Sequence, residues 1–257
     1  MEHKEYLEKK LEPTSLPKEE LRKYFEAFNQ PFQEVVFEEA GTLTIEKGDL
    51  KIDLQYEFPP KELFVKNTKD IFKLPREKQR LFEGMDAVPN KYRQLKKFTL
   101  ENKKAVLNIT DLVPETKIFF RTNFDKKGKE SLGNSRFDVE INSVILSNHI
   151  LNSYGMAILL HEVGHASYPF TLSAEEFPRP KDPDEKIYFT HEQLQVVLRS
   201  ERNANAFMLK KIKPFMTDLE IDPAALDKFI QYQLGDYSRQ IKAALSGKSW
   251  PPDLHEV

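Results

Sequence analysis

The sequence predicts an α+β fold in which a small sheet is joined to two long helices. Three observations predict it: alternating apolar residues over 42–58, short β-branched and aromatic runs between 117 and 147, and apolar stripes at helical spacing on either side of residue 180. The chain has 257 residues, 39% hydrophobic and 31% charged, with 19 Phe and 9 Tyr for a core. This composition is typical of a globular protein and not of a disordered one.

The N-terminal part is expected to hold a short amphipathic helix followed by a β-hairpin over Thr42–Phe58, with its turn at Gly48. Pro59-Pro60 ends this pattern. We therefore predict a helix-plus-hairpin extension over 1–60 and a main domain over 61–257.

Residues 61–110 are expected to be helical in pieces, because apolar residues recur there at roughly helical intervals. The stretch from Lys61 to Lys104 has 13 Lys and Arg against 6 Asp and Glu. Since these charges are interspersed with apolar residues, they indicate a solvated helix face, and no nucleic acid binding is predicted.

Strands are expected at 117–124 and 136–141, and the apolar run at 144–147 either adds another strand or leads into the next helix. A helix should then begin with Asn152 or Ser153 as its N-cap and end near Ser167, before Pro169. A last amphipathic helix is expected over 222–245, opened by Asp222 and Pro223.

An H-E-x-x-H motif lies on the first of these helices, at His161, Glu162 and His165. Residues four apart share one helix face, so both imidazoles are able to point at one metal ion, with Glu162 beside it. Two nitrogen ligands and a carboxylate that accepts a proton from water are what a zinc hydrolase needs. The chain has only 6 His, which gives this spacing weight.

Glu201 is the first candidate for a third ligand, because it lies on the apolar stripe of the helix predicted to end at Ile212. A carboxylate on a buried stripe is costly unless it is paired or binds a cation. Asn205, one turn later, would orient a ligating His. The alternatives are that Glu201 pairs with a buried cation, or that His191, near the start of that helix with Thr190 as its N-cap, completes a His₃ site.

Other zinc classes are excluded by what the sequence lacks. The extension of the motif found in metzincins would place Gly and His where the chain has Tyr168 and Thr171. The chain has no Cys, so it has no thiolate ligand, no disulfide and no cysteine nucleophile.

The two motifs, His161-Glu162-Val163-Gly164-His165 and Glu201-Arg202-Asn203-Ala204-Asn205-Ala206-Phe207, resemble the ImmA/IrrE-type zinc metallopeptidases, a gluzincin-like group. The resemblance covers roughly residues 135–212. It implies a zincin-like domain with Zn²⁺ held by His161, His165 and Glu201, Glu162 as general base and Asn205 beside the ligands. This chain departs from the family in having Asn203 where a second Glu is common, and in the longer interval 166–200.

The function expected is hydrolysis of peptide bonds in a peptide or protein substrate, with Tyr168, Tyr188 or His191 as candidate oxyanion donors. A metal-bound regulatory or protein-binding module with little hydrolytic activity is the alternative, and a non-peptide substrate is not excluded by the motif. The interval 166–189 is either a lid or an ordered loop. A charged N-terminus and the lack of a long apolar run predict a cytoplasmic protein with no membrane partner. The sequence does not fix the oligomeric state.

Overall fold

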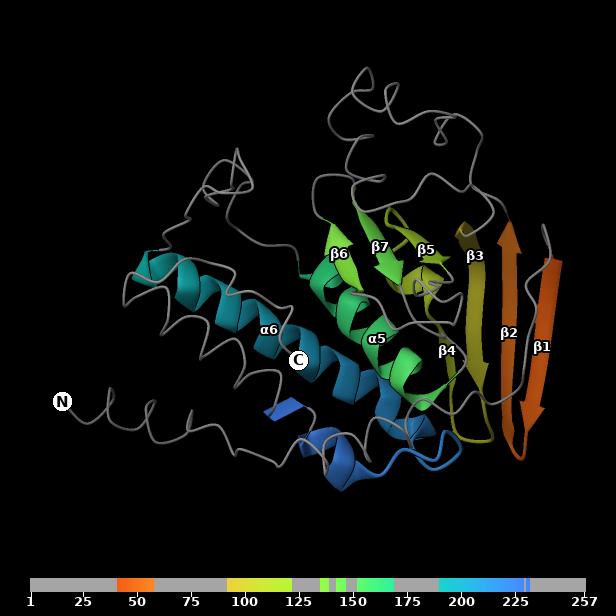
Figure 1. Ribbon diagram of the computed structural model, residues 1–257. Coiled ribbons are helices and arrows are strands. Elements are labelled where there is room, and N and C mark those ends of the chain that lie inside the picture. The colour runs from red at the N-terminus through yellow and green to blue at the C-terminus, as the bar shows by residue number, and fades with distance from the viewer. Residues whose placement is uncertain are drawn as a thin grey trace, which may run out of the picture.

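The described part of the chain forms one mixed sheet with two helices on one of its faces (Figure 1). In the computed structural model, the residues described are 41–57, 92–121, 135–138, 142–146, 152–168, 190–228 and 230–231. The expected helix before residue 41, and most of the interval 166–189, lie outside these residues.

The described residues contain seven strands and two long helices. The strands are β1 (Gly41–Lys47), β2 (Leu50–Glu57), β3 (Tyr92–Glu101), β4 (Val106–Asn108), β5 (Lys117–Arg121), β6 (Arg136–Asp138) and β7 (Ser143–Leu146). The helices are α5 (Ser153–Ser167) and α6 (His191–Ile212), with single 3₁₀ turns at Thr110–Leu112 and Lys213–Phe215. The sheet order is β1-β2-β3-β5-β7-β6. The short strand β4 pairs with the C-terminal end of β3. An α+β architecture is therefore confirmed.

The expected hairpin is confirmed as β1 and β2, joined by a two-residue turn in which Gly48 has φ +60°. A positive φ suits Gly because it has no Cβ to clash with the backbone. On its other side, β2 pairs antiparallel with β3, so the hairpin is part of the same sheet as the strands beside the helices. The boundary expected at Pro59-Pro60 lies outside the described residues.

The helical expectation for 61–110 is wrong at β3, which is a ten-residue strand. Leu95 pairs with Tyr56 and Lys97 with Gln55, so Lys96 is an extra residue in the ladder. This β-bulge separates Leu95 and Phe98, both buried, by three positions, where a regular strand would separate them by two. Because of the bulge, buried residues of β3 recur at an interval that is typical of a helix.

The strands expected in 117–124 and 136–141 are present as β5 and β6, and the apolar run at 144–147, for which a strand was one of two alternatives, belongs to β7. β5 and β7 are parallel, whereas β6 pairs antiparallel with β7 and is the last strand of the sheet order. Phe119 and Ile145, neighbours across β5 and β7, are buried although they point away from the core shared with the helices. Burial on both faces explains why these strands are continuous apolar runs.

Both helices begin at the N-caps that the sequence predicts. The side chain of Asn152 accepts a hydrogen bond from the backbone N–H of Gly155 at the start of α5. Thr190 and Gln193 form a reciprocal capping box at the start of α6. α5 ends at Ser167, as expected. Asp222 also caps the next helical residues, 223–228, by accepting from the N–H of Ala224, while 232–245 lie outside the described residues.

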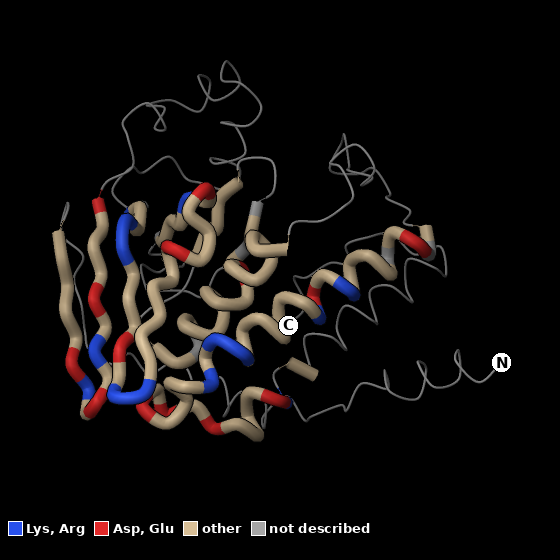
Figure 2. The backbone as a smooth tube through the Cα atoms, turned by 180° about the vertical axis from the view of Figure 1, so that it is seen from behind, with Lys and Arg blue, Asp and Glu red and all other residues tan. Residues whose placement is uncertain are grey.

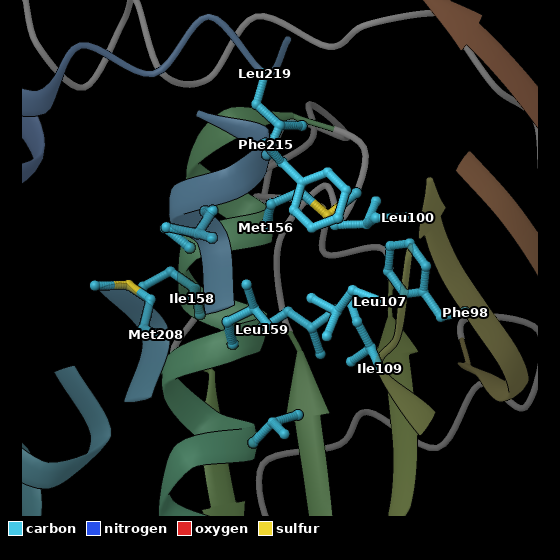
Figure 3. Close-up of a cluster of buried hydrophobic side chains, with 14 of the residues drawn as sticks. Phe98, Leu100, Leu107, Ile109, Met156, Ile158, Leu159, Met208, Phe215 and Leu219 are labelled. Carbon is cyan, nitrogen blue, oxygen red and sulfur yellow. The ribbon is translucent and has the colours of Figure 1, made fainter. Parts of the chain in front are cut away.

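The main core lies between the sheet and the helices (Figure 3). Met156 and Leu159 on α5 are fully buried against strand residues that include Phe98 and Leu100. Met208 on α6 joins the same cluster. α5 therefore lies next to the sheet, and α6 packs across it (Figure 1).

Acidic and basic residues are mixed along the outer strands and along α6 (Figure 2). Of the basic stretch 61–104, only residues from 92 onward are described, and these belong to β3 and the turn after it. No helix in the described part of the chain is both long and apolar enough to cross a membrane.

Candidate metal centre

Three buried side chains from the two helices meet at one point. His161 and His165, one turn apart on α5, direct their Nε2 atoms toward each other at 3.1 Å. Glu201 of α6 places Oε2 at 3.2 Å from Nε2 of His161 and Oε1 at 3.4 Å from Nε2 of His165. The predicted triad is therefore brought together, and it is a group of three donors suited to a metal ion.

The spacing of these donors fits a divalent metal. Ligands at about 2.0–2.1 Å from a tetrahedral zinc lie about 3.3 Å from one another. The Nε2–Nε2 and Nε2–carboxylate separations are 3.1, 3.2 and 3.4 Å, close to that value on each edge. Two imidazoles and one carboxylate are also a donor set that zinc commonly takes, with a fourth position left open.

The hydrogen bonds behind the triad orient its rings. Nδ1 of His161 lies 3.0 Å from Oδ1 of Asn205. Because a carbonyl oxygen only accepts, this contact puts a proton on Nδ1, so that Nε2 is the nitrogen whose lone pair would bind a metal once its own proton is lost. Asn205 therefore has the position beside the ligands that the sequence predicts.

Ser200 supports the second ring, and sequence reasoning missed it. Its Oγ lies 3.0 Å from Nδ1 of His165. Ser200 directly precedes Glu201 and is buried with it on the side of α6 that faces α5. A short polar residue next to a buried carboxylate was the available signal, but Ser200 was not counted among the residues of the buried stripe.

Gly164 sets the distance between the two helices. A Cβ built at this position would lie 2.9 Å from Cα of Ala204 and 3.0 Å from its carbonyl oxygen. Real Cβ atoms essentially never approach backbone so closely, so only Gly permits this contact. The glycine inside H-E-x-G-H thus allows α6 to come near enough for Glu201 to reach the pair of His.

Glu162 lies beside the triad without belonging to it. It is 8% exposed, and its Oε2 accepts a hydrogen bond from the backbone N–H of Phe137 on β6 at 2.7 Å. The carboxylate therefore sits between α5 and the edge strand of the sheet. This is the noncoordinating position that the motif predicts for a general base.

The protein side chains shift one another's ionisation. Burial raises the pKa of Glu162 above its usual value, and the positive charges of His161 and His165 only partly oppose this. Burial lowers the pKa of His161, but the hydrogen bond to Glu201 and the charge of Glu162 outweigh it, so that the pKa is raised. Burial also raises the pKa of Glu201, yet the hydrogen bonds from the two His bring it down to about 2. The raised pKa of His161 and the lowered pKa of Glu201 both show that the triad favours a bound positive charge.

No family profile, curated protein or solved structure matches this chain. The resemblance to the ImmA/IrrE-type metallopeptidases therefore depends on the two motifs alone, and the buried His-His-Glu triad that it implies is present.

The other candidate residues are placed as follows. His191 begins α6 ten residues before Glu201, about 15 Å away along the helix axis. Tyr168, at the end of α5, is 57% exposed, and its ring packs edge-to-face against Phe207 with centroids 6.2 Å apart. Tyr188 lies outside the described residues, as does the side chain of His191. Glu201 is thus the third donor brought to the His pair.

Proposed function

We propose that the protein is a zinc-dependent peptidase with a His₂Glu metal site and a glutamate general base. The observation that carries the proposal is the combination of three donors at tetrahedral spacing with a second carboxylate, Glu162, held next to them and outside the donor set. A zinc that only stabilises a fold is usually closed by four protein ligands and needs no adjacent base. In the described part of the chain, the group has three donors.

His161, His165 and Glu201 would hold the metal. When bound there, zinc lowers the pKa of a coordinated water and polarises the carbonyl under attack. Asn205 and Ser200 keep the two rings in the orientation seen here, so the donor atoms stay together during turnover.

Glu162 moves the proton. Its carboxylate takes a proton from the attacking water as the oxygen bonds to the scissile carbon, and it gives that proton to the amine nitrogen as the C–N bond breaks. The raised pKa of Glu162, caused by burial, brings it nearer to neutral pH, where one group is able to accept a proton and then release it.

A peptide substrate is favoured because the base lies at the edge of the sheet. β6 is the last strand of the sheet order and contacts Glu162 through its backbone. An extended chain close to this edge would have its amide bonds near the base and the three donors. The family resemblance points to the same substrate class.

The test combines metal analysis with hydrolysis of a quenched fluorescent peptide library. We expect about one zinc per chain and cleavage in the wild type, zinc without cleavage in Glu162→Gln, and loss of both in Glu201→Ala. Glu192→Gln changes an exposed Glu on the same helix and should retain both properties. Zinc binding with no cleavage by the wild type would favour a regulatory or protein-binding module, and absence of metal after reconstitution would overturn the proposal.

A further inference from the structure

The amide of Phe137 faces outward from the sheet. Phe137 pairs with Val144 across the antiparallel strands β6 and β7, in which opposite residues alternate between hydrogen-bonded and non-hydrogen-bonded pairs. Its N–H donates to Glu162, so this pair is the non-hydrogen-bonded kind. The backbone groups of Phe137 therefore point away from β7, and the carboxylate of Glu162 meets one of them there.

This contact is a strong one for a carboxylate at a reaction centre. The N–H to Oε2 distance is 2.7 Å, at the short end for a charge-assisted hydrogen bond, and Glu162 is buried. It ties the side chain of one helix to the backbone of a strand. Because the donor is a backbone group, its position is fixed by how α5 packs on the sheet. The two elements are in direct contact.

The two oxygens of Glu162 consequently differ. Oε2 is engaged by Phe137, whereas Oε1 accepts no hydrogen bond from a described residue. Within the described residues, Oε2 is thus the anchored oxygen of Glu162, and Oε1 is the oxygen left to take a proton from water.

We propose that the backbone N–H of Phe137 positions the general base, and that this amide is reserved for Glu162 and does not pair with substrate. The inference rests on the proposed function, because it assigns Glu162 the role of base. Phe137 is then a positioning residue, whose backbone N–H acts through Glu162. The identity of the Phe137 side chain matters less than the presence of this N–H donor.

The first experiment tests the contact without any substrate. In protein as purified, labelled with ¹⁵N-Phe, the Phe137 amide should resonate downfield and exchange slowly with solvent. Glu162→Ala should move that resonance upfield and speed its exchange at least about tenfold, as expected for loss of a hydrogen bond to a charged group. The amide of Phe98, on β3, should be unchanged. If the resonance and the exchange rate of the Phe137 amide are unchanged in Glu162→Ala, the proposal is overturned.

The second experiment separates positioning from stability. Phe137→Pro removes the N–H, which an edge strand tolerates where that group does not join the ladder, while Phe137→Ala removes the ring and keeps the N–H. With a cleaved peptide, kcat of the Pro variant should lie about 10- to 100-fold below that of the Ala variant, with KM similar. Equal kcat values in two folded variants would contradict a positioning role. If the wild type cleaves no peptide, the proposed function fails, and the amide measurement still decides this contact.

Discussion

The Cα of Gly164 on α5 faces the backbone of Ala204 on α6 so closely that a Cβ at residue 164 would stand 2.9 Å from the Cα of residue 204. This contact lies between the metal-site residues, since His161 and His165 flank Gly164, and Glu201 and Asn205 flank Ala204. This close approach of the helices and the convergence of the donors are therefore parts of the same packing contact.

Gly164→Ala should weaken both metal binding and the fold. The added methyl group has to push α6 away, and overpacking of this kind costs about 1–3 kcal/mol of unfolding free energy. The displacement separates Glu201 from the two His, so zinc affinity measured by chelator competition should fall. The double variant Gly164→Ala/Ala204→Gly should not recover, because the clash is with backbone atoms of residue 204. Full recovery would contradict this account.

Asn205→Ala should reduce zinc affinity by about 10- to 100-fold, the usual effect of losing a group that orients a ligand. The change removes the acceptor at 3.0 Å from Nδ1 of His161 and frees that ring to rotate. Asn203→Ala is the matched control, because Asn203 is exposed on the same helix. Similar losses from both substitutions would show that helix stability, and not ring orientation, is responsible.

Zinc should raise the melting temperature of the chelator-treated protein. Free metal at a thousandfold excess over Kd adds about 4 kcal/mol of stability, equivalent to roughly 8–16 °C in a domain of this size. Glu201→Ala should lose most of this shift and Glu192→Ala should keep it. A shift of unchanged size in Glu201→Ala would place the metal elsewhere.

Metal-free protein should become less stable as pH rises from mildly acidic to alkaline. His161 and Glu162 have raised pKa values, so the folded state binds more protons than the unfolded state through this range, and stability falls with pH. Glu201, with a pKa of about 2, acts in the opposite direction only below its ordinary value of 4.5. Bound metal replaces the proton at the triad. The stability of the metal-bound protein should therefore fall less as pH rises. Urea midpoints of both forms across pH 5–9 check this, and parallel profiles would refute it.

Much of the candidate site could be predicted from sequence because each helix carries its own signals. His161 and His165 are four residues apart, so their common face follows from helix geometry. Glu201 was identified because a carboxylate on an apolar stripe needs a partner. Thr190 and Asn152 also mark their helix starts by side-chain chemistry that operates locally.

The features that were missed depend on contacts between elements. The bulge at Lys96 exists only opposite Gln55 and Tyr56, and it turned a strand pattern into an apparent helical one. The Phe137 amide is a backbone group, and every residue except Pro has one, so no residue type marks it. The pairing of β2 with β3 joins segments separated by 34 residues outside the described part, 58–91.

The triad joins two helices whose ligands are separated by the chain from His165 to Glu201. A bound ion would therefore act as a reversible crosslink that closes this loop. The entropy of closing a loop grows only slowly with its length, by about 0.6 kcal/mol for each doubling. Because the helices also contact each other directly at Gly164 and Ala204, the site does not depend on the connection to hold it together. A change in the length of the interval 169–189 should accordingly have little effect on metal affinity.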